Sequence, residues 1–119
     1  SVKTAFGNFG TSKDALRNII YNDKGVLAAQ SLYNQGIQNI NRKNPSTPNL
    51  KGMSNFEAQY GALANDPDVV HLIGLVGNKS IDQLSQADKA HFQQYFKGKD
   101  LKALFDQKDK LENLVKGAQ

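Results

Sequence analysis

The stretch from Asp66 to Val76, DPDVVHLIGLV, constrains the fold of this chain more than any other segment. Asp66 can cap the amino end of a helix, and Pro67 suits the first helical position, where its missing N–H costs nothing. The residues that follow are apolar on nearly every side of the predicted helix. A helix that is apolar all round has to be buried among other elements. The sequence therefore predicts a central helix at 69–76 that the rest of the chain encloses.

Helix start signals also precede the other apolar segments, and the apolar residues of those segments recur at helical spacing. We expect further helices over residues 11–25, 26–41, 54–63, 85–98 and 100–116, with a short turn at 80–84. Ser54 with Glu57 and Ser80 with Gln83 fit the capping box, in which two side chains satisfy two free backbone N–H groups. These signals predict where the helices begin.

Two glycines interrupt the amino-terminal half of the chain. Lys24-Gly25 is predicted to end the first helix, because glycine tolerates a left-handed cap. Gly36 costs ~1 kcal/mol relative to alanine within a helix and indicates close packing or a bend. No segment alternates as a strand does, and Asn44–Asn49 holds two prolines that favour an exposed loop. The fold is therefore predicted to be all-α, a compact single-domain bundle of six or seven short helices.

Length and composition limit the kind of protein further. At 119 residues the chain is long enough for one helical domain, 1–119, with a real core, and it holds no cysteine for disulfides, thiol chemistry or a Cys-based zinc site. No apolar run approaches the ~18 residues that cross a bilayer, so we expect a soluble protein. The chain begins at Ser1 without an initiator Met, and we expect that it was cut from a longer protein. The cellular compartment and the oligomeric state stay open.

The apolar run before Lys79-Ser80 is similar to the approach to a nucleotide-binding loop. That loop needs G-x-x-x-x-G-K-[S/T], because its backbone N–H groups must wrap the phosphates. Ile73 and Asn78 stand where the two glycines would be required. Gly77-Asn78 is therefore interpreted as the carboxyl end of the central helix.

Other candidate chemical groups are sparse. His71 lies in the predicted central helix, where a single histidine is more often a partnered core residue than a ligand, and the paired-histidine motif of zinc proteases is absent. We expect no metal and no cofactor, and we assign no catalytic residue. The enzymatic alternative is a small hydrolase with Glu57 as general acid and Asp66 or Asp68 as its partner.

The charge distribution suggests nucleic acid as one possible partner. Residues 1–51 carry seven basic and two acidic side chains, and the NDKG stretch at 22–25 is similar to the joint of a helix-turn-helix. The chain has only two arginines, although arginine is the residue that reads guanine edges. The residues of this alternative are Lys13, Arg17, Lys24, Arg42 and Lys43.

A protein partner is the interpretation that the sequence favours. Helical domains with an amide-rich surface most often act by contact, as adapters or assembly modules, and this chain holds 12 Asn and 10 Gln. Phe92 and Phe96 can face the core, which places Tyr95 on the flank beside His91. Aromatic anchors with polar rims are typical of interfaces. The predicted interaction residues are His91, Tyr95, Lys97 and Lys99.

Overall fold

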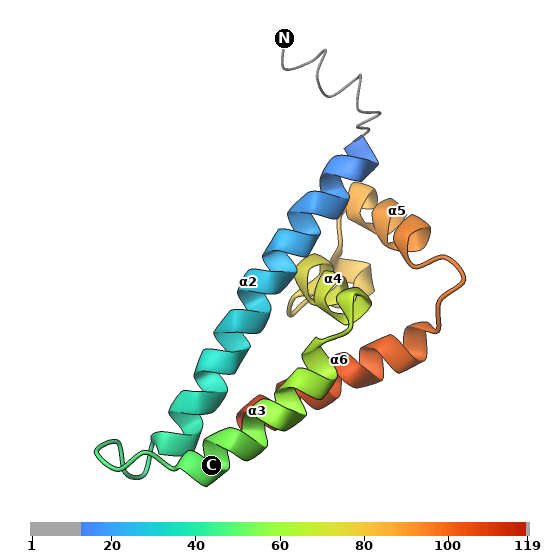
Figure 1. The fold of residues 1–119 in the computed structure, drawn as a ribbon. Coiled ribbons are helices and arrows are strands. Elements are labelled where there is room, and N and C mark those ends of the chain that lie inside the picture. The colour runs from blue at the N-terminus through green and yellow to red at the C-terminus, as the bar shows by residue number, and fades with distance from the viewer. Residues whose placement is uncertain (1–12, 119) are drawn as a thin grey trace.

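The computed structural model describes residues 13–118, and this part of the chain is helical without any strand. Figure 1 shows how its elements are arranged. The elements are α2 (Lys13–Asn41), α3 (Leu50–Ala64), α4 (Pro67–Val76), a 3₁₀ turn η1 (Ile81–Gln83), α5 (Gln86–Tyr95) and α6 (Leu101–Lys116). The all-α prediction is confirmed. The predicted number of six or seven helices is wrong, since the described residues form five α-helices.

The difference arises at Gly25, which lies inside one continuous 29-residue helix and ends none. Gly25 is buried against α4, where an added Cβ would lie 2.0 Å from the Val70 carbonyl oxygen. Gly74 of α4 faces the same contact, because its Cβ would lie 2.0 Å from the Tyr21 carbonyl oxygen and 2.6 Å from Gly25 N. The two glycines therefore let the backbones of α2 and α4 touch. Gly25 serves helix packing, and the predicted break between 25 and 26 does not exist.

Gly36 confirms the predicted close packing further along α2. A Cβ at Gly36 would lie 2.1 Å from the ring of Phe56, so the aromatic ring of α3 fills the space that a side chain would need. The predicted capping box at Ser54 is wrong, because α3 begins earlier, at Leu50. The Asn49 side chain accepts from Gly52 N at 2.9 Å and caps the helix, which leaves Ser54 within it.

The start signals at Asp66 and Ser80 act as predicted, whereas the start predicted at residues 11–12 lies outside the described residues. Asp66 accepts from Asp68 N at 2.9 Å with Pro67 in the first turn, and the Ser80–Gln83 capping box opens η1. Gly77 ends α4 with a φ of 57°, the left-handed region that favours glycine. Lys79 and Ser80 therefore follow a helix end, and the helical structure agrees with the rejection of a nucleotide loop.

The core forms around α4, as its apolar composition predicts. Val69 and Leu72 are fully buried, and Ile73, Leu75 and Val76 are at most 5% exposed. Aromatic and aliphatic residues of α5, its carboxyl-terminal cap and α6 complete this cluster: Phe92, Phe96, Leu104 and Leu111. A second cluster of Ile40, Phe56 and Val115 joins the carboxyl ends of α2 and α6 to α3. Helix α2 spans both clusters, and its first half lies beside α4 and α5 (Figure 1).

Candidate functional site

Two buried histidines from different helices face each other beside α2. The Nε2 atoms of His71 in α4 and His91 in α5 are 2.9 Å apart, and the two residues are 0% and 1% exposed. The outer nitrogen of each ring contacts α2: His71 Nδ1 lies 2.7 Å from Asn22 Oδ1, and His91 Nδ1 lies 2.7 Å from Asp14 Oδ1. These four side chains, here called the histidine row, join three helices through one line of hydrogen bonds.

Burial decides the electrostatics of the row. Removal from water, together with the neighbouring His91, lowers the pKa of His71 to about 4. The ring of Tyr95 stacks on His71 with ring centres 3.6 Å apart and planes 8° from parallel. Burial also raises the pKa of Tyr95, so this ring covers His71 as a neutral phenol. The imidazole of His71 is therefore held neutral and covered.

Charged groups surround the row at the protein surface. The Tyr21 hydroxyl donates to Asp88, and burial followed by this bond raises the pKa of Tyr21 to about 12. Arg17 lies 3.8 Å from the same carboxylate. On the other side of the row, Lys99 Nζ lies 2.7 Å from both carboxylate oxygens of Asp68. Each of these carboxylates thus already has a donor within the fold.

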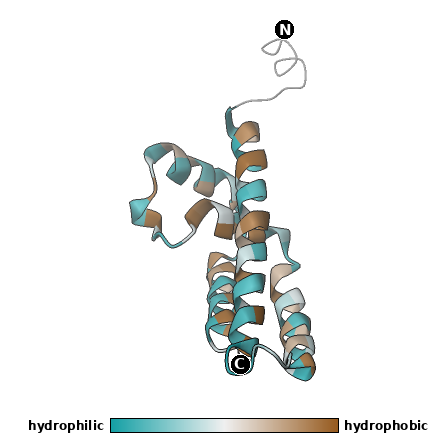
Figure 2. Ribbon diagram, turned by 90° about the vertical axis from the view of Figure 1, so that its left-hand side faces the viewer, coloured by the Kyte–Doolittle hydropathy of each residue, from teal (hydrophilic) through white to brown (hydrophobic). Residues whose placement is uncertain are grey.

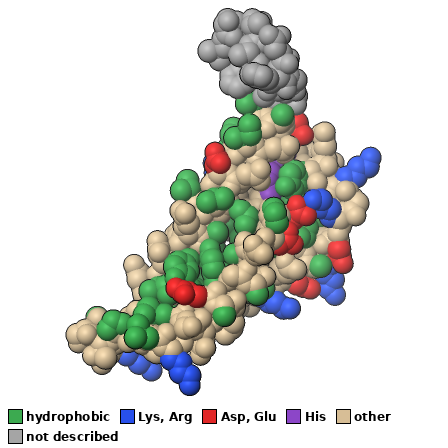
Figure 3. Space-filling model, viewed as in Figure 1, with side chains coloured by type: hydrophobic (Ala, Val, Ile, Leu, Met, Phe, Trp, Pro, Cys, Tyr) green, Lys and Arg blue, Asp and Glu red, His purple; other side chains and the backbone are tan. Residues whose placement is uncertain are grey.

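The outer side of α2 carries four of the seven exposed large apolar residues of the described chain. Ile19, Ile20, Val26 and Leu27 are 48–65% exposed. The residues of each pair, 19/26 and 20/27, are seven positions apart, so each pair forms a strip along the helix, and the two strips are neighbours on its exposed side. Figure 2 shows hydrophobic segments along the first half of α2, and Figure 3 shows hydrophobic side chains gathered over this helix. We call Ile19, Ile20, Val26 and Leu27 the outer α2 face.

One edge of this face is basic. Lys13, Arg17 and Lys24 are four and seven residues apart, which places them along the same edge of α2. They line a shallow hollow together with Leu16, Ile20 and Tyr21. The Lys24 ammonium also lies 5.4 Å from the centre of the Tyr21 ring. An apolar surface bordered by cations suits a partner that is apolar with an acidic border.

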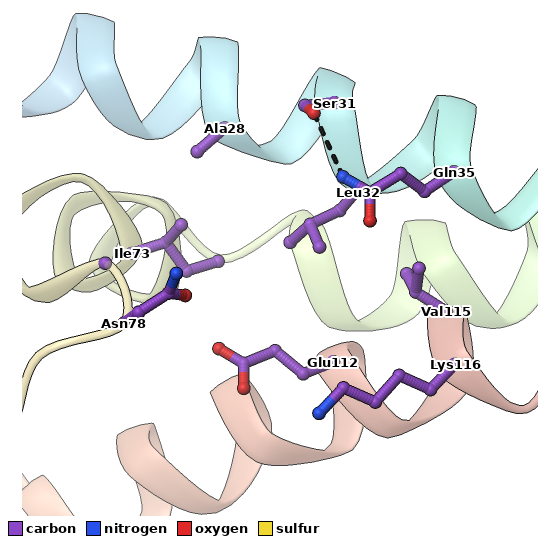
Figure 4. A pocket seen from close by; sticks show the side chains of 10 residues that line it. Ala28, Ser31, Leu32, Gln35, Ile73, Asn78, Glu112, Val115 and Lys116 are labelled. Atoms are coloured by element: carbon purple, nitrogen blue, oxygen red, sulfur yellow. Dashed lines mark hydrogen bonds between the residues drawn. The ribbon is translucent and has the colours of Figure 1, made fainter.

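A pocket of about 340 Å³ lies between α2, the carboxyl end of α4 and α6. Figure 4 shows Ile73 and Leu32 on its apolar side, with Glu112 and Lys116 entering from α6. The Glu112 carboxylate is already paired with Lys108 at 2.7 Å. The pocket has the size of a small-molecule site, but its ionisable groups form no acid–base or nucleophile–base pair.

The predicted interaction residues divide between the surface and the interior. Lys97 and Lys99 are exposed, and Tyr95 is half-buried because its ring lies on His71. His91 is buried in the histidine row, so its side chain is not available to a partner. The side chains of Phe92 and Phe96 are buried, as predicted. Lys99 is held by Asp68 and also lies 5.2 Å from the Tyr95 ring centre.

The residues of the nucleic-acid alternative fall into two groups. Lys13, Arg17 and Lys24 lie in the first half of α2, whereas Arg42 and Lys43 follow its last turn and line a separate small pocket. A 29-residue helix is about 43 Å long, so the two groups are far apart. The helix-turn-helix joint expected at 22–25 is wrong, because these residues lie inside the continuous α2.

The residues of the hydrolase alternative have separate structural roles. Glu57 accepts a hydrogen bond from the Tyr33 hydroxyl, Asp66 caps α4, and Asp68 binds Lys99. The 340 Å³ pocket is lined by neither Glu57 nor His71. Within residues 13–118, no three His, Asp or Glu side chains are grouped as ligands of a metal ion. The same part of the chain holds no helix long and apolar enough to cross a bilayer.

Sequence reasoning missed both the histidine row and the outer α2 face. The row joins residues up to 77 positions apart in the sequence, so no local pattern of residues predicts it. The outer α2 face did leave a signal in the sequence, namely the apolar pairs 19/26 and 20/27, each seven positions apart. Comparisons with protein-family models, curated proteins and solved structures found no match to this chain.

Proposed function

We propose that this chain is a non-enzymatic helical protein-interaction domain, and that its outer α2 face binds a helix of a partner protein. The single observation that carries the proposal is the exposure of Ile19, Ile20, Val26 and Leu27 on one side of the longest described helix. Isolated exposed apolar residues are ordinary, whereas several on one helix face mark a contact surface. Their seven-residue spacing matches the way an amphipathic helix lies along another helix.

Charge indicates the chemistry of the partner. Lys13, Arg17 and Lys24 border one edge of the outer α2 face, so the partner helix should carry acidic residues along its matching edge. Asp23 lies between Ile19 and Val26 on the exposed side of α2. A symmetric antiparallel pairing of two copies centred here would bring two Asp23 carboxylates together. The proposal therefore favours a different protein over a second copy of this chain.

The surface around Tyr95, Lys97 and Lys99 is a second contact region within the same proposal. Lys97 and Lys99 are exposed, and Tyr95 is half-buried. Tyr95 and Lys99 already make intramolecular contacts with His71 and Asp68, so a partner would have to bind them in place. This region supports the proposal less strongly than the outer α2 face does.

Binding to two designed peptides tests the proposal. Both peptides are amphipathic helices with the same apolar seam, and they carry either glutamate or lysine along the flanking edge. We expect fluorescence anisotropy to show binding of the glutamate peptide. Leu27→Asp should weaken that binding at least tenfold, because burial of a leucine side chain contributes about 1.5–3 kcal/mol. Gln38→Asp is the matched control, since it adds the same charge at an exposed position later in α2.

Two results would count against this surface. One is equal affinity of wild type and Leu27→Asp for the glutamate peptide, and the other is absence of binding to either peptide. Nucleic acid binding through Lys13, Arg17 and Lys24 remains the alternative proposal. It instead predicts affinity for a generic duplex that falls steeply with salt and is unchanged by Leu27→Asp.

A further inference from the structure

The hydrogen bonds of the histidine row determine how many protons its two rings hold. A neutral imidazole has one donor and one acceptor nitrogen, whereas an imidazolium has two donors. His91 Nδ1 faces the Asp14 carboxylate and His71 Nδ1 faces Asn22 Oδ1, so both outer nitrogens carry hydrogen. The inner Nε2 atoms, 2.9 Å apart, then require one further proton, because two bare lone pairs at this distance would repel each other. The row thus holds one proton more than two neutral rings.

The partners of the two outer nitrogens differ, because that of His91 is paired with a carboxylate, whereas that of His71 is paired with a neutral amide. The distance fits a shared proton, since 2.9 Å is an ordinary N–H···N length and is shorter than the about 3.3 Å between two imidazole nitrogens on a tetrahedral metal ion.

We propose that the histidine row is a proton-operated latch that holds α5 on α2 and α4 with one shared proton and releases α5 when a second proton binds. A second proton would place two positive rings 2.9 Å apart in a buried site, where their repulsion is poorly screened. The depressed pKa of His71, about 4, agrees with this resistance to a second proton. The titratable and charged groups facing the pair are Asp14, Arg17 and Tyr21 of α2, Asp68 of α4, Asp88 and Tyr95 of α5, and Lys99.

Helix α5 is the element that such a latch can release. Its backbone makes few close contacts with the other described helices, and it lies at the side of the molecule (Figure 1). It is attached through side chains, namely Asp88 to Tyr21, His91 to the row, and Phe92 into the core. Phe92 is 5% exposed in the closed arrangement, so release would uncover an apolar surface in acid. Protons can reach the row at Asp14, whose side chain is 33% exposed.

Nuclear magnetic resonance of the histidine side-chain nitrogens, recorded from pH 8 to pH 4 with a chelator present, tests the proton count. We expect one ring to be protonated on both nitrogens and the other on Nδ1 alone. The second ring should take up its proton at a pH nearer to 4 than to 6.5, and the backbone amides of residues 88–95 should then exchange with solvent before those of residues 69–76.

Two opposite variants make the test sharper. Asp14→Asn removes the charge that balances the shared proton, so it should raise the pH of α5 release by about one unit. Asn22→Asp gives His71 a carboxylate partner and should lower that pH by a similar amount. Asp23→Asn removes the same charge from an exposed neighbouring position and should leave it unchanged.

Several results would overturn the latch. In one, Asn22 donates its amide N–H to His71 and both rings are neutral at pH 7. In a second, Asp14→Asn and Asn22→Asp leave the pH of α5 release unchanged. In a third, the backbone amides of α5 and α4 lose their protection from exchange at the same pH. A zinc or copper ion that shifts both ring signals at stoichiometric concentration would identify the pair as a metal site.

Discussion

At the scale of single residues, glycines decide how closely the helices approach. Gly25 and Gly74 face each other where α2 crosses α4, and each lies where a Cβ would overlap a carbonyl oxygen of the other helix. Such an oxygen belongs to a helix backbone and cannot turn away as a side chain does. The contact therefore depends on the absence of a side chain, and the freedom of glycine to adopt unusual φ angles plays no part in it.

Gly74→Ala should destabilise the protein by about 3 kcal/mol, because its methyl group would lie 2.0 Å from the Tyr21 carbonyl oxygen and the helices would have to separate. The matched control is Gly61→Ala in α3, where a Cβ meets nothing within 4 Å. That change should stabilise by about 0.5–1 kcal/mol, since alanine favours the helix. Urea unfolding measures both. Similar effects of the two changes would disprove the close helix contact.

The pKa of His71 makes stability depend on pH. The folded value of about 4 lies below the ordinary value of 6.5, so the unfolded chain takes up a proton that the folded chain refuses. Between pH 6.5 and pH 4 the free energy of unfolding should therefore decrease as the pH falls, with a slope of at most about 1.4 kcal/mol per pH unit.

Urea unfolding at pH 7, 6 and 5 checks this dependence. His71→Gln provides the comparison and should show a flatter profile over this window, because glutamine does not titrate. A wild-type profile without slope between pH 6 and 5 would show that folded His71 takes up its proton as readily as an exposed histidine does.

At the scale of elements, α4 organises the fold and α2 presents two different sides. Helix α4 could be predicted as central because its residues are apolar all round and its start is marked by Asp66 and Pro67. Helix α2 could not be predicted as one element, since a glycine after lysine is equally typical of a helix end. Only the α4 backbone beside Gly25 distinguishes a packing glycine from a cap, and that neighbour comes from 45 residues further along the chain.

Shortening a side chain to alanine should change the free energy of unfolding much more in α4 than on the outer α2 face. Ile73→Ala in α4 should cost about 2–5 kcal/mol, because Ile73 is 5% exposed in the main core. Leu27→Ala on the outer α2 face should change the free energy of unfolding by no more than about 0.5 kcal/mol, since Leu27 is 65% exposed. Thermal or urea unfolding compares them. A large loss from Leu27→Ala would show that the outer α2 face is covered in the free protein.

At the scale of the whole molecule, the sequence predicted the fold class and the main core but not the candidate site. Helix caps and apolar spacing are local, so they can be recognised without knowing which helices meet. The histidine row depends on helices α2, α4 and α5 meeting, and His91 was consequently expected at the surface. The outer α2 face is exposed because the other helices pack on different sides of α2. The local spacing of residues in the sequence does not determine which side of a helix stays uncovered.

A photo-crosslinking amino acid at position 27, in the cell that makes this protein, tests most directly the claim that the outer α2 face binds a partner protein. The same group at Gln38 and at Lys97 serves as the control for a later part of α2 and for the Tyr95 region. We predict covalent capture of one discrete protein from position 27, abolished by adding Ile20→Asp. Capture of the same protein only from position 97, or capture of nucleic acid in place of protein, would contradict the claim.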